Sequence, residues 1–147
     1  MKEHNTEFDK ISNEVIGAAI EVHKALGSGL MESIYHNALK IELRKKGIKY
    51  ESEITVKIWY SDEEVGSHRL DLVVNDEIIV ELKTVPEISN VHRAQVMSYL
   101  KAAGLEIGLI LNFSKPTLEV RRAYLKHPNS IPPEYELIIE RSHKDLY

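Results

Sequence analysis

Charged side chains stand inside two segments of the sequence that are otherwise apolar. Asp71 interrupts residues 70–74, and Glu81 and Lys83 follow the apolar run at 78–80. Both segments are rich in β-branched residues and apolar on both faces, which is typical of central strands that are covered on both sides. An unpaired charge in such a strand is costly. Because side chains alternate along a strand, Glu81 and Lys83 share a face, so an acid and a base are directed to the same place.

The loop between these two strands decides whether the two acids meet. If residues 75–77 form the loop, Asp71 lies opposite Glu81, whereas a two-residue loop would pair Asp71 with Val80 and direct the acids to opposite faces. We predict the three-residue loop, or a bulge with the same effect. Two opposed carboxylates repel each other, and they tolerate this arrangement when a divalent cation lies between them. The alternative is that Glu81 and Lys83 form a surface ion pair on a half-exposed strand.

A third acid is predicted on a helix. Glu32 is in line with Tyr35, Leu39 and Leu43 at steps of three and four, so it shares a stripe with residues that should be buried. It also lies near the start of the helix, where a carboxylate is favourable. Two interpretations stay open: Glu32 joins the two strand acids, or it interacts only with the helix dipole.

A later helix carries polar residues on one face. Gln95 and Tyr99 are four residues apart, so they are neighbours on the helix that directly follows the strand with Glu81. Gln95 could equally lie at the rim of an ordinary amphipathic helix. His92, one turn earlier, could reach a bound phosphate or be a solvent-exposed histidine.

Apolar periodicity predicts the elements that position these residues. The predicted helices cover residues 8–26, 30–46 and 91–103, the predicted strands cover 49–60, 70–74, 78–85, 107–113 and 117–125, and 61–67 is a turn. A strand, a helix and another strand form a βαβ unit, so 107–113 should lie parallel to 78–83. The order α-α-β-β-β-α-β-β predicts an α/β fold with one mixed sheet and helices on both faces.

Length and composition restrict the class of protein. The 147 residues suit a single domain over 1–147, with a core at about 8–125 and an irregular tail at 126–147 that has room for a last strand at 135–140. No apolar run approaches the ~18 residues of a membrane span. The chain has no cysteine, which excludes thiolate metal sites and fits a cytoplasmic protein. The net charge is −4, so contact with nucleic acid would need a local basic patch, with residues 44–46, 115, 121–122 and 126 as candidates.

Together these features resemble the PD-(D/E)XK nuclease superfamily. Asp71 followed by Glu81-Leu82-Lys83 matches its D…ExK signature on adjacent strands, although Leu70 stands where the family name has proline. The helix acid and the later Q-x-x-x-Y pair are similar to its RecB-like branch. The segment GLMESIY at 29–35 has the form that names the GxxExxY family of this superfamily. The resemblance covers residues 10–122 and implies a restriction-endonuclease-like fold.

The resemblance also implies a metal site. Asp71, Glu81 and the main-chain carbonyl of Leu82 would hold Mg²⁺ or Mn²⁺ through oxygen ligands. Glu32 would complete the site or hold a water molecule there. The metal would lower the pKa of water and neutralise the phosphate.

The remaining residues of the signature would act on the substrate. Lys83 would orient the attacking water or stabilise the developing charge, and Gln95 and Tyr99 would hold the phosphate or the waters of the metal. The implied function is a metal-dependent nuclease that hydrolyses phosphodiester bonds of DNA or RNA. One alternative is a catalytically inactive module of the same fold that binds nucleic acid or protein, which the acidic net charge favours. Another is a dimeric interaction protein with a structural ion cluster, and a homodimer is an option for the nuclease as well.

Overall fold

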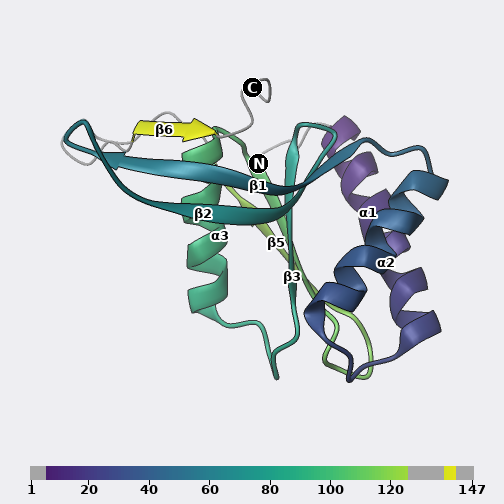
Figure 1. Cartoon of the computed structure of the whole chain (residues 1–147). Helices are drawn as coiled ribbons and strands as arrows, with labels where there is room; N and C mark the ends of the chain where they lie inside the picture. Colours follow the sequence, from purple (N-terminus) through teal and green to yellow (C-terminus); the bar gives the residue numbers. More distant parts are fainter. Residues whose placement is uncertain (1–5, 126–137, 142–147) are drawn as a thin grey trace.

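The computed structural model describes residues 6–125 and 138–141, with side chains from residue 10 to residue 125. In chain order the elements are α1 (Thr6–Leu26), α2 (Glu32–Lys45), β1 (Tyr50–Tyr60), β2 (Glu63–Val74), β3 (Ile78–Lys83), α3 (Asn90–Ala103), β4 (Ile107–Asn112), β5 (Glu119–Tyr124) and β6 (Ile138–Arg141). The strands form one sheet in the order β5-β4-β3-β2-β1-β6 (Figure 1). Within these ranges, no helix combines the length and the apolar character that crossing a membrane requires.

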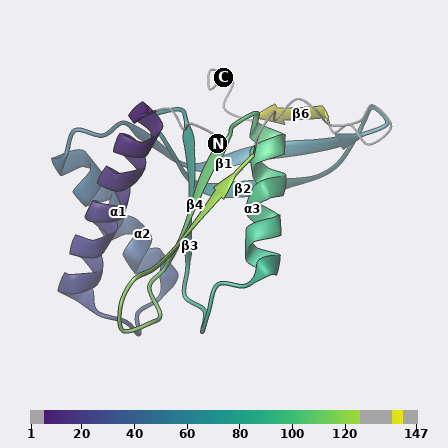
Figure 2. The ribbon, with the colours of Figure 1, turned by 180° about the vertical axis from the view of Figure 1, so that it is seen from behind.

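Helices cover both faces of the sheet. Figures 1 and 2 show α1 and α2 on one side of the strands and α3 on the other. β4 is parallel to β3, and every other neighbouring pair of strands is antiparallel. The predicted α/β architecture, its element order and the parallel βαβ unit are therefore confirmed.

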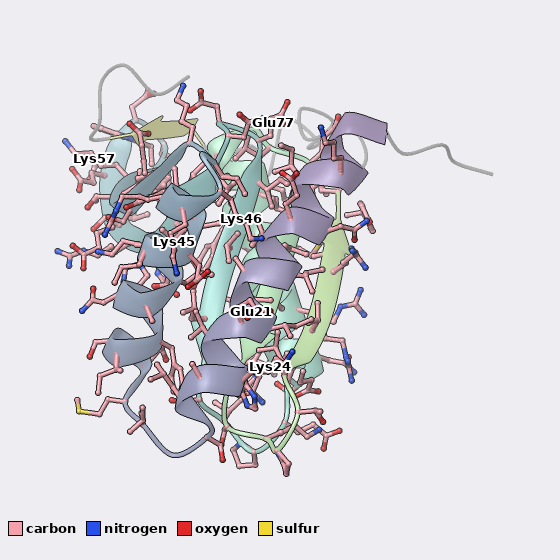
Figure 3. All side chains as sticks on the ribbon, turned by 90° about the vertical axis from the view of Figure 1, so that its right-hand side faces the viewer. Glu21, Lys24, Lys45, Lys46, Lys57 and Glu77 are labelled. Carbon is pink, nitrogen blue, oxygen red and sulfur yellow. The ribbon has the colours of Figure 1, made fainter. Side chains whose placement is uncertain are left out.

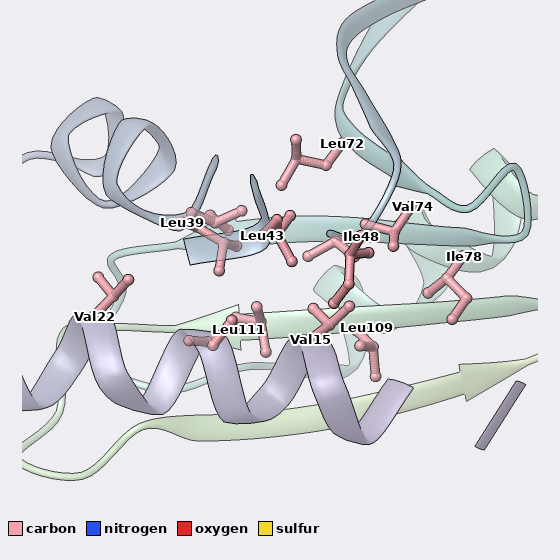
Figure 4. Close-up of a cluster of buried hydrophobic side chains, with 14 of the residues drawn as sticks. Val15, Val22, Leu39, Leu43, Ile48, Leu72, Val74, Ile78, Leu109 and Leu111 are labelled. Carbon is pink, nitrogen blue, oxygen red and sulfur yellow. The ribbon is translucent and has the colours of Figure 1, made fainter. Parts of the chain in front are cut away.

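Two apolar clusters hold the layers together. One lies beneath α1 and α2 (Figure 4) and includes Val15, Val22, Leu39, Leu43, Ile48, Leu72, Val74, Ile78, Leu109 and Leu111. The other lies beneath α3. Ile78 belongs to the first cluster and its neighbour Ile79 to the second, so β3 is buried on both faces as predicted. Each such aliphatic side chain contributes roughly 1.5–3 kcal/mol when fully buried, which makes charged groups on this strand conspicuous.

A glycine corner joins α1 to α2. Gly27 and Gly29 have φ of 71° and 104°, conformations that residues with a Cβ rarely adopt. The hydroxyl of Tyr35 donates to the Gly27 carbonyl at 2.6 Å and accepts from the Leu30 N–H at 3.1 Å. α2 begins at Glu32, two residues later than predicted. The glycine and tyrosine of the GLMESIY segment thus fix the corner from which Glu32 projects.

The β1–β2 hairpin is longer than the sequence predicts. Residues 61–67 were expected to form a turn, but only Ser61 and Asp62 do so, with φ of 51° and 66°. β2 begins at Glu63, and the prediction of a strand restricted to 70–74 is wrong. Residues 63–67 are exposed, so this part of the strand has no buried face and no alternating apolar pattern.

The tail contains a strand close to the place that the sequence allowed for one. β6 occupies residues 138–141 and pairs antiparallel with β1, with Ile138 opposite Trp59. The range overlaps the optional strand at 135–140. Main-chain pairing to the edge of β1 accounts for this strand, and the rest of the tail lies outside the described residues.

The hairpin changes the face that it buries at one point. Leu72 lies in the cluster beneath α1 and α2, whereas Leu70 lies in the cluster beneath α3. Residues two apart on an uninterrupted strand share a face, so β2 rotates at the intervening residue, Asp71. On β1, Ser52 pairs with Leu72 and Ile54 pairs with Leu70, and Glu53 between them has φ of 56°. That conformation costs roughly 1–2 kcal/mol for a residue other than glycine, and beyond it the hairpin leans over α3 (Figure 1).

The approach of α3 to the sheet depends on Gly108 of β4. A Cβ at this position would lie 2.7 Å from Cγ1 of Val96, which is on the inner face of α3. Such a contact is too short for two carbon atoms, so the missing side chain lets the helix lie close to the strand. Val96 directly follows Gln95, one of the predicted site residues.

Candidate active site

The register of β2 and β3 brings the two strand acids together. Val74 pairs with Ile78, so residues 75–77 form the predicted three-residue loop. The regular pairing ends at Leu72, and the next position would place Asp71 opposite Glu81. There the main chain bonds to side chains instead: the Asp71 N–H donates to Oε2 of Glu81 at 3.2 Å, and the Leu82 N–H donates to Oδ2 of Asp71 at 2.8 Å. Each carboxylate is held by the main chain of the opposite strand.

Glu81 is a buried acid beside another acid. Its side chain is 5% exposed. Burial first, and then the negative charge of Asp71, raise the pKa of Glu81 to about 8, and the hydrogen bond from the Asp71 N–H only partly offsets them. The charge of Lys83 also acts against the rise. The hydrogen bond and the lysine therefore compensate the repulsion between the two acids only in part.

Lys83 occupies the same face of β3 and contacts α3. Its Nζ lies 3.5 Å from Oε1 of Gln95. Among the ion pairs of the described residues, none joins Lys83 to Glu81 within 4.0 Å. The alternative of a simple Glu81–Lys83 surface pair does not describe this arrangement, because the acid is buried and the lysine is directed toward the helix.

Glu32 lies close enough to the strand acids to be affected by their charges. Partial burial of its carboxyl group raises the pKa of Glu32, the charge of Asp71 raises it further, and the charge of Lys83 lowers it. Tyr35, Leu39 and Leu43 are fully buried as predicted, whereas Glu32 at the end of their stripe is exposed. It therefore stands at the solvent side of the acid pair, in the first turn of α2.

Tyr99 reaches the site from the inner side of α3. Its partner there is His68, which the sequence reasoning missed. The two rings stack with centroids 3.8 Å apart, and the Tyr99 hydroxyl lies 3.0 Å from Nδ1 of His68. Burial raises the pKa of Tyr99, and the charges of Glu81 and Asp71 add to the rise. Burial lowers the pKa of His68, so this imidazole is held in the neutral form. His68 lies in β2 between the predicted turn at 61–67 and the predicted strand at 70–74, so the sequence assigned it to no element and no face.

His92 has a structural contact instead of a place in the site. Its Nδ1 accepts from the Ser89 N–H at 2.9 Å, and its own N–H donates to Oγ of Ser89 at 3.3 Å. These reciprocal bonds are a capping box at the start of α3. Both bonds lie at the surface of the protein, so His92 is a surface histidine whose contact is with the cap of its own helix.

The main chain of Asp71 is contacted by a second histidine, His36, which the sequence reasoning also missed. Nε2 of His36 lies 3.1 Å from the Asp71 carbonyl oxygen. A carbonyl only accepts hydrogen bonds, so Nε2 carries the proton. His36 is four residues after Glu32 and therefore on the same helix face. That spacing was a usable signal in the sequence.

A buried polar network fixes the loop between Lys83 and α3. The side chain of Asn112 bonds both main-chain groups of Val85, at 3.1 and 2.8 Å, and donates to Oε1 of Glu119 at 2.9 Å. The same Glu119 oxygen accepts from the Ile88 N–H at 3.2 Å. Asn112 pairs with Lys83 in the parallel ladder, so this network holds the end of β3 and the entry to α3 together.

The donors at the acid pair suit a hard divalent cation. Two acids meet there, the repulsion between their ionised forms is only partly compensated, and the main-chain carbonyl of Leu82 belongs to the same segment. A cation between the acids would remove the repulsion that raises the pKa of Glu81. In the described part of the chain, no three histidine or acidic side chains are grouped closely enough to hold a metal by themselves, so water would have to supply further ligands.

The fold and this pair of acids define a class of protein: the chain has a restriction-endonuclease-like α/β fold. The family model described as the PD-(D/E)XK nuclease superfamily matches residues 9–123, and the chain belongs to that superfamily. Among solved structures it is similar to the one titled "Crystal structure of SSO0001", with a TM-score of 0.51 and 18% identity over 84% of this chain and 69% of that chain. This likeness concerns the fold alone. The search of curated proteins found no match.

Proposed function

We propose that this protein is a divalent-metal-dependent nuclease that hydrolyses phosphodiester bonds in DNA or RNA. The observation that carries the proposal is the meeting of Asp71 and Glu81 inside the sheet, each bonded to the other strand's main chain. Such an arrangement is unfavourable for stability, because apolar residues at buried sites are often more stable than charged ones. Membership of a nuclease superfamily supports the same reaction.

Asp71, Glu81 and the carbonyl of Leu82 would hold Mg²⁺ or Mn²⁺, with Glu32 completing the site or holding a water molecule at its solvent side. Such an ion supplies charge neutralisation at the phosphate and a lower pKa for water. The protein contributes orientation: the Leu82 N–H donates to Oδ2 of Asp71, which fixes that carboxylate relative to the peptide of Leu82.

Lys83, Gln95 and Tyr99 would act on the substrate. Lys83 shares the face of Glu81 and would orient the attacking water or stabilise negative charge on the phosphate. Gln95, on the exposed side of α3, accepts from Lys83 and would hold the phosphate next to it. Tyr99 is 8% exposed, so we assign it the innermost contact, beside both acids.

We also propose that the chain belongs to the GxxExxY group of the superfamily. The support comes from the structure as well as from the sequence. Gly29 has the positive φ that the corner requires, and Tyr35 forms hydrogen bonds to that corner. Glu32 lies close enough to the acid pair for the charge of Asp71 to affect it. A homodimer and a cytoplasmic location stay predictions from the sequence.

Cleavage assays test the proposed reaction directly. Wild type, Lys83→Ala and Lys49→Ala are incubated with Mg²⁺, Mn²⁺ or EDTA over single-stranded, duplex and branched DNA and RNA. Lys49 is the matched control, because it bonds Asp76 at 2.7 Å near the opposite end of β3. We expect metal-dependent cleavage that falls roughly 10²-fold or more in Lys83→Ala and stays near wild type in Lys49→Ala. Equal background for wild type and Lys83→Ala on every substrate would overturn the proposal.

The second candidate is a catalytically inactive module of the same fold that binds nucleic acid or protein. The observation that favours it is charge. The net charge is −4, and the outer sides of α1 and α2 carry both signs, as Glu21, Lys24, Lys45 and Lys46 show in Figure 3. The basic run at 44–46 lies at the far end of α2, about 20 Å from Glu32 for a helix of this length. Binding without cleavage in the same panel would favour this candidate.

A further inference from the structure

Both main-chain polar groups of Asp71 are bonded to side chains. The N–H donates to Glu81 of the neighbouring strand, and the carbonyl accepts from Nε2 of His36 on α2. Asp71 is also the residue at which β2 changes the face that it buries. The peptide that carries the acid is therefore located where the regular pairing of β2 with β3 has ended.

His36 is the contact that α2 makes with this peptide. It projects from the same helix face as Glu32, one turn later, and its side chain is partly buried. α2 itself is anchored by Tyr35, Leu39 and Leu43, which are fully buried in the core. A rigid helix thus holds a hydrogen-bond donor against the carbonyl of a strand residue that lies at a distorted position.

The orientation of this peptide determines where the carboxylate of Asp71 lies. A side chain projects from its Cα in a direction that the adjoining peptides fix, and the carboxylate then accepts from the Leu82 N–H at 2.8 Å. Loss of the His36 donor would leave the partly buried Asp71 carbonyl without a hydrogen bond. An unsatisfied carbonyl of this kind costs roughly 1–3 kcal/mol if no other donor replaces the histidine. A rotation of the peptide would relieve that cost and displace the carboxylate.

We propose that His36 is a positioning residue for Asp71: its Nε2–H holds the Asp71 carbonyl and thereby keeps the carboxylate at the metal-binding position, coupled to Glu32 through α2. The inference rests on the proposed function, since it concerns the same acids. It adds a residue that touches neither substrate nor metal. A histidine that merely fills space at this position would have no specific effect on Asp71.

Amide hydrogen exchange of the full chain distinguishes these roles without metal or substrate. The variants are His36→Leu, which removes the donor, His36→Gln, which retains one, and Asn37→Leu, which makes the same change at the adjacent exposed position. We expect exchange at the amides of Asp71 and Leu82 to accelerate about tenfold in His36→Leu only, as loss of one hydrogen bond's protection would give. The amides of Leu72 and Val80, which pair in the regular ladder, should keep wild-type rates.

Two exchange results would overturn the proposal. One is an unchanged rate at Leu82 in His36→Leu, which would mean that Asp71 keeps its place without the histidine. The other is equal acceleration at Leu72, Val80 and Leu82, which would mean that His36 stabilises the whole fold. Acceleration in His36→Gln equal to that in His36→Leu would likewise contradict a role for the donor.

Binding of Mn²⁺, followed by electron paramagnetic resonance, tests the consequence for the acid pair. We expect the dissociation constant to rise about tenfold in His36→Leu, as for other residues that orient metal ligands, and to stay near wild type in His36→Gln and Asn37→Leu. An unchanged constant in His36→Leu would contradict the proposal. A wild type that neither binds Mn²⁺ nor cleaves nucleic acid would instead contradict the proposed function, while hydrogen exchange still decides the role of His36.

Discussion

Two buried glutamates of the same sheet are held in opposite ways. Glu119 of β5 is 7% exposed and Glu81 of β3 is 5% exposed. Although burial acts to raise the pKa of Glu119, hydrogen bonds from Asn112 and the Ile88 N–H, together with the charges of Lys115 and Arg121, hold it below its usual value. Burial and the neighbouring Asp71 raise the pKa of Glu81 to about 8.

The difference shows that burial alone does not mark a functional acid. Glu119 is surrounded by donors and cations, and its work is to hold the loop that leads from β3 to α3. Glu81 has a second acid where a cation would be expected. A buried acid whose ionised form the protein compensates only in part is the better candidate for binding a cation from solution.

Glu81→Gln is expected to have the largest effect of the changes that test this comparison. If Glu81 binds the metal, the variant should lose roughly 10³-fold or more of nuclease activity, about 4 kcal/mol in the barrier. Glu119→Gln should retain activity within a small factor, because a glutamine oxygen still accepts from Asn112. Rates on the best substrate from the cleavage panel measure both. Equal losses in the two variants would remove the functional distinction.

The stability of the metal-free protein should depend on pH through Glu81. Its folded pKa of about 8 lies above the ordinary value of 4.5, so between these values the folded chain retains a proton that the unfolded chain releases. Stability should therefore fall as pH rises through this window, by an amount on the order of 3 kcal/mol.

Chemical denaturation of wild type and Glu81→Gln at pH 5 and pH 8 measures this effect. The difference between the two proteins isolates Glu81 from Glu32, whose raised pKa acts in the same direction, and from His68, whose lowered pKa acts in the opposite one. Parallel pH profiles would show that Glu81 is ionised at neutral pH without a metal.

Glu119→Ala should reduce stability instead of chemistry. The change leaves the Asn112 amide and the Ile88 N–H without their acceptor, which costs about 2 kcal/mol. Glu119 has a lowered pKa, so its contribution is present at neutral pH and is lost as pH falls through the acidic range. The difference in free energy of unfolding from wild type, measured by urea denaturation, should therefore narrow in acid. A constant difference at all pH values would assign the loss to packing.

Arg121→Ala should have the smallest effect. The ion pair joins Nη2 of Arg121 to Oε2 of Glu119 at 3.1 Å, but the arginine side chain is 47% exposed. Solvent screens such a pair, so we expect a loss below about 1 kcal/mol, decreasing with added salt. A loss as large as that of Glu119→Ala would mean that the cation, and not the hydrogen bonds, compensates this acid. Urea denaturation at low and high salt measures it.

The sequence predicts the acid pair because its geometry is local. Residues 75–77 determine the register of β2 and β3, and the alternation of side chains then places Glu81 and Lys83 on one face. The apolar runs around Ile79 and Leu72 reveal that both strands are buried. All of this depends on residues close together in the chain, where periodicity is informative.

Other parts of the site depend on contacts that leave no periodic signal. The outer half of β2 is exposed and residues 61–67 read as a turn, so the predicted strand begins only at residue 70 and leaves His68 outside any predicted element. The left-handed conformation of Glu53 follows from the bend of the hairpin, and nothing in its residue type indicates it. His36 contacts the main-chain carbonyl of Asp71. Every residue has such a carbonyl, so only the packing of α2 against the sheet determines which one the histidine contacts.

The missing side chain of Gly108 lets α3 pack closely against the sheet next to β3. The contact between Lys83 and Gln95 is already 3.5 Å long, and Val96 occupies the space that a methyl group at position 108 would need. An alanine there would have to displace the Val96 side chain and would disturb the close packing of α3 on β4. A residue without a side chain thus sets how closely α3 packs beside β3, the strand that carries Glu81 and Lys83.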